Sequence, residues 1–271
     1  DVKQELIEVK INDKGEVDVK HIVKASNMPG TLHLFSGTIS NLVVTNEMGE
    51  EKQSGIINDG LGNQSVFVLP SKENSIIKYN LENIILKNNL FITQISYAEK
   101  FSIVFDDQIK MIFVNNNAIF LEDKKGISVN GGGEIKIEFY SDIPKMIKEV
   151  QWEENKFNVE IITDSEIENF NFDQTSKSIS FEVNEENKYV TISMSEELLG
   201  GPYVILFDTE KIQYTKSEID GYVTLSMKPE LTGEITIIGT TVIPEFSMFI
   251  PLIMGFLIIL TVPFVKKINL H

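Results

Sequence analysis

The first clear pattern along the chain is strict alternation of apolar and polar residues on both sides of a turn. Val9 and Ile11 alternate with polar neighbours, and residues 17–23 (VDVKHIV) alternate again, with a Gly-containing turn at residues 13–15 between them. Side chains of period two point to opposite faces of a strand, so one face of each segment is apolar. This pattern predicts a β-hairpin.

Similar short runs continue to about residue 140, separated by Gly, Pro and Asn. They predict strands at Leu32–Phe35, Ile39–Thr45, Ser65–Leu69, Ser75–Leu81, Leu90–Tyr97, Phe101–Phe105, Lys110–Val114, Ala118–Leu121 and Glu134–Tyr140. Asn115-Asn116-Asn117 is predicted to be a tight turn. No stretch here has a sustained amphipathic helix pattern, and Leu81–Lys87 is the best short candidate for a helix. Regular short strands with Gly and Asn turns indicate an all-β domain.

We place a domain boundary at Asp142-Ile143-Pro144, which gives domains 1–143 and 144–241. Strands are predicted after it at residues 149–153, Phe157–Ile162, Ile167–Phe172, Ser178–Val183, Tyr189–Met194, Tyr203–Phe207, Tyr222–Met227 and Glu234–Ile238. Seven or eight strands in about ninety residues is the size of an immunoglobulin-like sandwich. We therefore expect two β-sandwich-like (immunoglobulin-like) domains, with Trp152 as a core anchor in the second.

The chain continues into a long uncharged stretch. Phe246–Val265 contains no charged residue, and twenty residues at about 1.5 Å each span roughly 30 Å, the thickness of a bilayer core. Lys266 and Lys267 follow directly, so the positive-inside rule places the C-terminus in the cytoplasm and the N-terminal ectodomain outside. Residues 242–271 are thus predicted to be one transmembrane helix with a short tail.

The span contains helix-perturbing residues at Pro251, Gly255 and Pro263. A Pro in a membrane helix frees a backbone carbonyl, which the helix itself or a neighbour must satisfy. One interpretation of this span is an ordinary anchor that tolerates Pro near each end. The other interpretation is a kinked helix packed against partner helices. The single Gly gives no GxxxG dimer face.

Charge and cysteine content narrow the class of protein. The net charge of −16 repels nucleic acid and anionic headgroups, so nucleic-acid binding is not expected. With no Cys, disulfides and thiolate metal sites are excluded, including a blue-copper centre. The chain opens at Asp1 without a charged leader, and with a C-terminal anchor this favours a signal peptide that has been removed.

Three segments of the second half carry a resemblance: Ile167–Phe172 with Ser178–Phe181, Glu197–Tyr203 (ELLGGPY) and Glu234–Phe246 (EITIIGTTVIPEF). Residues 150–265 resemble the membrane-proximal β domain that ends many archaeal surface proteins. Residues 5–145 are more loosely similar to a module that accompanies this ending in ammonia-oxidising archaea. The resemblance implies a cell-envelope location and brings no catalytic residues.

The resemblance also bears on the fate of the tail. Related tails commonly have Gly after the PEF triplet, and some are thought to be sorting signals cut by an archaeosortase. Here Ser247 follows the triplet and the chain runs on to His271. We therefore expect a permanent anchor rather than a cleaved one.

Few residues are candidates for chemistry. His21 falls on the apolar face of its strand and is expected to be a core histidine, while His33 can face either way. A Ser-His-Asp hydrolase would need one of these two, and no G-x-S-x-G elbow accompanies either. His21, His33 and Met28 together are a candidate copper trio, since imidazole and thioether ligands suit that metal.

Acidic and glycosylation motifs complete the candidates. Asp106, Asp107 and Asp220 stand in acidic turns of the kind that bind Ca²⁺ in extracellular modules, although no D-x-D-x-D-G loop is present and solvated turns are favoured. Asn63 begins the only N-x-S/T sequon and is a candidate for glycosylation.

The sequence leaves three functional hypotheses. The first is a non-catalytic, single-pass structural or interaction protein of the archaeal envelope, without cofactors. Its partners would be the lipid bilayer and other membrane or envelope proteins in a hetero-oligomeric complex. The second is an accessory subunit of a membrane enzyme complex that is ammonia monooxygenase-like, and the third is a copper- or calcium-binding module.

Overall fold

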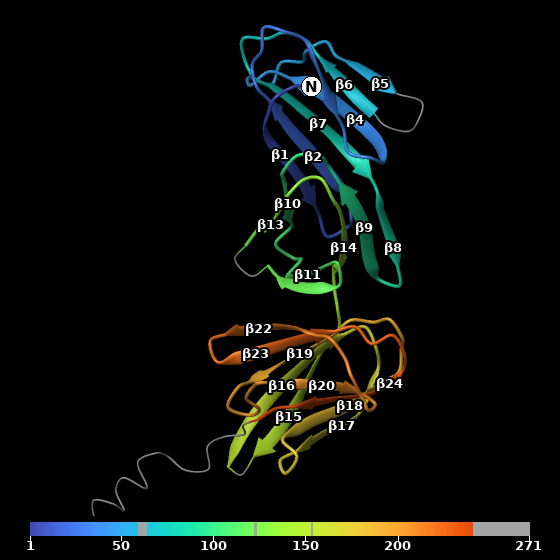
Figure 1. Cartoon of the computed structure of the whole chain (residues 1–271), viewed down its shortest axis with the longest axis vertical. Helices are drawn as coiled ribbons and strands as arrows, with labels where there is room; N and C mark the ends of the chain where they lie inside the picture. Colours follow the sequence, from blue (N-terminus) through green and yellow to red (C-terminus); the bar gives the residue numbers. More distant parts are fainter. Residues whose placement is uncertain (59–63, 122–123, 153, 241–271) are drawn as a thin grey trace, which may run out of the picture. The chain divides into compact units, whose positions relative to one another are not determined.

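The computed structural model describes residues 1–58, 64–121, 124–152 and 154–240 (Figure 1). All regular elements in these ranges are strands, which confirms the all-β prediction. In the same ranges no helix has the length and apolar character needed to cross a bilayer. The predicted span, with Phe246, Pro251, Gly255, Pro263, Lys266 and Lys267, lies outside the described residues, as does Asn63.

The chain divides into two compact units, Asp1–Ile143 (unit 1) and Pro144–His271 (unit 2). The strands of unit 1 are β1 (Gln4–Ile11), β2 (Val17–Val23), β3 (Gly30–His33), β4 (Thr38–Thr45), β5 (Gly55–Asn58), β6 (Gln64–Val68), β7 (Ser75–Glu82), β8 (Ile84–Lys87), β9 (Leu90–Ser96), β10 (Phe101–Phe105), β11 (Met111–Val114), β12 (Asn117–Phe120), β13 (Gly126–Val129) and β14 (Glu134–Tyr140). They form three sheets with the orders β13-β10-β1-β2-β7-β4, β12-β11-β14-β9-β8 and β3-β6-β5.

The predicted first hairpin is confirmed and lies at the centre of the largest sheet. β1 pairs antiparallel with β2, and Val17, Val19, His21 and Val23 are all buried. On its other side β1 pairs parallel with β10, a contact between segments more than ninety residues apart. The apolar faces of all three sheets contribute to one core. The period-two pattern thus determines which side chains of each strand face the core. Each apolar face is buried because another sheet covers it.

The helix predicted at Leu81–Lys87 is wrong. β7 continues to Glu82, and Ile84–Lys87 forms the strand β8, paired with β9. Asn88 and Asn89 join the two strands with φ of 49° and 61°, the positive values that a two-residue type I′ hairpin turn requires. The β-branched Ile84 and Ile85 also favour a strand over a helix.

Several strands escaped the sequence pattern. They are β5, β13, β21 (Glu210–Lys211) and β22 (Thr215–Ile219), together with the first half of β15 (Lys145–Trp152). Each of these strands lies at the edge of its sheet, and β5 is exposed along its whole length. β5, β21 and β22 bury no side chain, so they have no need of apolar alternation and lack the signal used to find strands.

Unit 2 is built from two sheets around a second core. Its strands are β15, β16 (Asn155–Thr163), β17 (Ile167–Asp173), β18 (Ser178–Val183), β19 (Val190–Ser195), β20 (Val204–Phe207), β21 (Glu210–Lys211), β22, β23 (Tyr222–Met227) and β24 (Gly233–Ile238). The sheet orders are β15-β16-β19-β23-β22 and β17-β18-β24-β20-β21. Buried residues of both sheets form one core. Trp152 is buried as predicted, with its ring edge-on to Phe172 at 5.9 Å.

The strand order of unit 2 departs from that of immunoglobulin domains. In constant-type domains the first sheet has the order A-B-E-D, so the fifth strand pairs with the strand that precedes it in the chain. Here the fifth strand of the unit, β19, pairs instead with β23, which comes later. What is shared is therefore a pair of antiparallel sheets around one core, and the connections differ.

The turn between β22 and β23 offers a test of the backbone requirement. Asp220 and Gly221 have φ of 50° and 78°, and a Cβ on Gly221 would meet no atom within 4 Å. We predict that Gly221→Val lowers the free energy of unfolding of unit 2 by about 1–2 kcal/mol. The valine side chain would meet no neighbouring atom through its Cβ, so the cost comes from forcing a β-branched residue into the left-handed backbone conformation. Urea unfolding followed by the fluorescence of Trp152 measures this.

Gly221→Asn is the matched control for that variant. Asn tolerates the left-handed region far better than a β-branched residue, so its loss of stability is expected to be a small fraction of that of Gly221→Val. Equal losses for the two variants would contradict the prediction.

Candidate functional site

His21 is the centre of a buried polar network in unit 1. It lies directly opposite Ile77 in the β2–β7 ladder, with Tyr79 two residues further along the same face of β7. Such diagonal neighbours are within reach of aromatic side chains. The His21 ring lies near those of Tyr79, Tyr97 and Phe35, with centroids 5.7 Å, 5.7 Å and 5.9 Å away. The prediction of a core histidine is confirmed, because His21 is fully buried.

Hydrogen bonds satisfy both nitrogens of this imidazole. Nδ1 lies 2.7 Å from Oε1 of Gln4, and Nε2 lies 3.1 Å from the hydroxyl of Tyr79. Gln4 in turn donates to the hydroxyl of Tyr97, which donates to the carbonyl of His33. The side chains of His21, Gln4, Tyr79 and Tyr97 are called the His21 network below. Since the amide oxygen of Gln4 only accepts, Nδ1 of the neutral imidazole carries the proton and Nε2 accepts from Tyr79.

Burial sets the protonation states in the His21 network. It lowers the pKa of His21 to about 4, because the charged imidazolium would lose its hydration. Burial likewise raises the pKa of Tyr97 to about 12. At neutral pH the network is therefore uncharged, which suits a structural role and leaves no nitrogen of His21 free for a metal or a substrate.

A second histidine joins two polar residues at the surface of unit 1. His33 is opposite Ser65 in the β3–β6 pair, with Nδ1 3.1 Å from the Ser65 hydroxyl and Nε2 3.2 Å from a carboxylate oxygen of Asp1. The side chains of His33 and Asp1 are 64% and 80% exposed. In a Ser-His-Asp triad the carboxylate is buried and fixes the imidazole, whereas water screens this pair. The three residues therefore do not form a preorganised hydrolytic site.

The copper trio is not supported by these positions. His21 has both nitrogens engaged, His33 is bonded to Ser65 and Asp1, and Met28 is 75% exposed. Across the described ranges, no group of three or more His, Cys, Asp or Glu side chains is placed to hold a metal ion.

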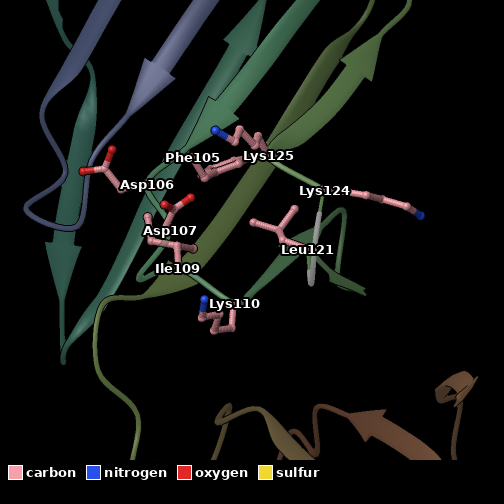
Figure 2. A pocket seen from close by; sticks show the side chains of 8 residues that line it. All are labelled: Phe105, Asp106, Asp107, Ile109, Lys110, Leu121, Lys124 and Lys125. Atoms are coloured by element: carbon pink, nitrogen blue, oxygen red, sulfur yellow. The ribbon is translucent and has the colours of Figure 1, made fainter. Parts of the chain in front are cut away.

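A cavity of about 310 Å³ lies between the β10–β11 and β12–β13 loops and contains two of the calcium candidates (Figure 2). Asp106 forms an ion pair of 3.4 Å with Lys10, and its carboxylate does not converge with that of Asp107 in Figure 2. Lys110, Lys124 and Lys125 also line the cavity, with their amino groups pointing in different directions. The charged groups are thus arranged neither as a cation cage nor as an anion cradle.

The third calcium candidate, Asp220, lies far from these residues in sequence and occupies the exposed turn between β22 and β23. Its positive φ is explained by the hairpin geometry. The structure therefore does not bring Asp220 together with Asp106 and Asp107 on one element.

The described part of unit 2 ends in a set of backbone contacts that we call the exit junction (Leu199, Gly200, Gly201, Gly239 and Thr240). The amide of Thr240 donates to the carbonyl of Gly200 at 2.9 Å, and the Thr240 hydroxyl donates to the carbonyl of Gly201. Gly239 packs so closely that a Cβ there would lie 2.6 Å from Leu199 and 2.7 Å from the Gly200 oxygen. Two sequence motifs about forty residues apart, LLGGPY and IIGTT, thus meet in space.

Two tyrosine hydroxyls donate hydrogen bonds to backbone carbonyls at and beside the exit junction. Tyr203 donates to the carbonyl of Leu199 at 2.8 Å, and Tyr214 donates to the carbonyl of Tyr203 at 2.9 Å. Burial, reinforced by the charges of Glu196 and Glu218, raises the pKa of Tyr203, so its hydroxyl remains a donor. A tyrosine bonded to the backbone a few residues upstream also braces a corner of immunoglobulin sandwiches.

An ion pair stands at the opposite end of β19. Lys188 lies 2.6 Å from Asp164 and 3.5 Å from Glu185. Burial lowers the pKa of Lys188, but the hydrogen bond and charge of Asp164 outweigh this effect, and the pKa stands above its usual range. The pair thus stays charged and ties together the loops before β17 and β19.

Sequence reasoning missed every partner in these clusters. A histidine on an apolar face must find partners, so the need for Gln4 or a tyrosine was foreseeable, but their identity depends on the register of β1, β2 and β7. The Gly-Gly-Pro-Tyr run at residues 200–203 is a local turn signal at the exit junction. Nothing in the sequence pointed to Thr240 as its partner.

No protein-family model, curated protein or solved structure matches this chain.

Titration of His21 gives a test of the network. The folded pKa of about 4 lies below the ordinary histidine value of 6.5, so the unfolded chain binds more protons between these values. The part of the free energy of unfolding that depends on neutral His21 is therefore fully present above about pH 6.5. It falls by roughly 3 kcal/mol as the pH drops to about 4. Hydrogen exchange of peptides from β2 and β7, followed by mass spectrometry across this range, measures the loss.

His21→Phe is the control, because Phe cannot titrate. We expect this variant to be less stable at pH 7 but to lose the component of the pH dependence that His21 causes. A variant with the same pH dependence as the original chain would contradict the assignment.

Proposed function

We propose that this chain is a non-catalytic, membrane-anchored structural or interaction protein of an archaeal cell envelope. Two β-sandwich modules would stand outside the membrane on one C-terminal transmembrane helix, with the last residues in the cytoplasm. The archaeal envelope assignment follows from the resemblance of residues 150–265. The accessory-subunit hypothesis, with an ammonia monooxygenase-like complex, remains the alternative.

The main structural support for this proposal is the exit junction. It fixes the end of the last strand by bonds from Thr240 to Gly200 and Gly201. Only five residues separate Thr240 from the uncharged stretch that begins at Phe246. A membrane helix there would hold unit 2 close to the bilayer, because so short a connection leaves no room for a flexible stalk.

The described residues also support a non-catalytic role. The buried polar groups of the His21 network are uncharged and mutually satisfied, and the side chains of His33 and Asp1 are largely exposed. Perturbed titratable groups in a cleft are the usual sign of catalysis, and His21 has its shifted pKa inside a packed core instead. The acidic composition suits a hydrated surface outside the membrane.

Membrane fractionation tests the anchor. We predict that the full chain stays with membranes after an alkaline carbonate wash, because about twenty apolar residues insert stably. A chain that ends at Thr240 should appear in the supernatant. A variant in which Phe246–Val265 is replaced by twenty leucines is the control and should remain in the membrane. Release of the full chain by carbonate would overturn the proposed function.

Native electrophoresis of detergent-extracted membranes, with mass spectrometry of the band, separates the two hypotheses. The structural proposal predicts recovery of the chain alone or with surface-layer protein. Co-migration with multi-span copper subunits would instead favour the accessory-subunit role. The variant with twenty leucines shows whether the specific sequence of Phe246–Val265, including Pro251 and Gly255, is needed for the association.

A further inference from the structure

Pro144 and Thr240, the two ends of the described part of unit 2, lie at opposite ends of its sheets. The chain enters at Pro144, whose carbonyl accepts from the amide of Thr163, and Thr163 pairs with Val190 at the start of β19. The other end of β19 is Ser195, roughly 17 Å away for five steps of about 3.4 Å. The entry point therefore shares the end of the sheet occupied by Val190.

The exit point shares the other end. The amide of Leu199 donates to the carbonyl of Ser195, so the LLGG turn lies directly beyond β19. Thr240 is bonded to this turn through Gly200. Figure 1 agrees, since β15 begins and β24 ends on opposite sides of unit 2.

Both terminal strands run along the line that joins these ends. β15 begins at the entry end and is paired with β16 over eight residue pairs. β24 ends at the exit end and is held on both sides, by six pairs with β18 and four with β20. Antiparallel hydrogen bonds lie perpendicular to the strands. A pull on Pro144 and Thr240 therefore loads each ladder lengthwise, so that many bonds must break together.

Side-chain packing adds to this resistance. Ile235 and Ile237 of β24 are completely buried, so sliding the strand drags them out of the core. At the exit junction, Lys177 donates from its amino group to the carbonyl of Thr240, while its own carbonyl accepts from the amide of Gly239. These contacts hold the last strand to the neighbouring turns where a pull on the tail would first act.

We propose that unit 2 is a tension-resistant coupling, in which load between Pro144 and Thr240 acts in shear on β15 and β24. Its further function is to transmit force between a partner bound by unit 1 and the membrane anchor. The inference rests on the proposed function only in taking the bilayer as the source of load at Thr240. The shear geometry itself is a property of unit 2.

Single-molecule pulling of the full chain in detergent tests this coupling. The chain has no cysteine, so Asp142→Cys with Thr241→Cys gives two unique handles across unit 2. The reference geometry uses Ile219→Cys with Thr241→Cys. Ile219 lies beside Tyr222, opposite Ser195 at the exit end, so this pair of handles peels the sheets from one end.

We expect the unfolding force in the first geometry to be about twofold higher, because forced unfolding is governed by the barrier along the pulling direction. The unfolding step should extend the chain by at most roughly 350 Å, for 99 residues at about 3.6 Å each. Equal forces in the two geometries, or a lower force across the ends, would overturn the proposal.

A matched pair of variants tests the exit junction. Thr240→Val and Thr224→Val each remove one hydroxyl hydrogen bond, to the carbonyl of Gly201 and to the hydroxyl of Ser193 respectively. Only Thr240→Val should lower the end-to-end force; an equal or larger loss for Thr224→Val would refute the role of the junction. If carbonate releases the full chain but the force ratio persists, the proposed function fails while the shear geometry stands.

Discussion

Both units depend on the burial of alternate side chains between facing sheets. The chain has no cysteine, and its described residues contain no cluster of three metal-ligating side chains, so neither disulfides nor such a centre support the described fold. Stability must come from apolar area removed from water, at about 25 cal/mol per Å². Strands such as β2 and β24, with every second side chain fully inside, provide this burial. The edge strands β5 and β22 bury no side chain and contribute mainly backbone hydrogen bonds.

The polar side chains of the His21 network are tolerated inside the core because they are paired. His21 would be costly to bury alone, yet Gln4 and Tyr79 satisfy both of its nitrogens and the core keeps it neutral. A buried network of this kind favours one register, since a slip of one residue would leave several polar atoms without partners. The His21 network therefore contributes to the specificity of the fold, and its burial keeps it from contacting substrates.

The exit junction links the fold of unit 2 to the proposed role of the tail. The LLGG turn and Thr240 close the sheet at the point where the chain leaves it, with Tyr203 bracing the turn from the core. The same junction lies at the far end of the sheets from Pro144. One structural feature thus both fixes how near the membrane unit 2 would stand and sets the direction in which load would act on β24.

The sequence alone determined the all-β class, most central strands and the turn of the first hairpin, because alternation and turn residues are local signals. It also placed His21 in the core, since that side chain shares a face with three valines. Only the tertiary structure decided that β1 pairs with β10, that Ile84–Lys87 is a strand, and that Thr240 meets Gly200. These contacts join residues distant in the chain or depend on a neighbouring strand. Local patterning cannot specify them, because their free energy arises only when the sheets assemble.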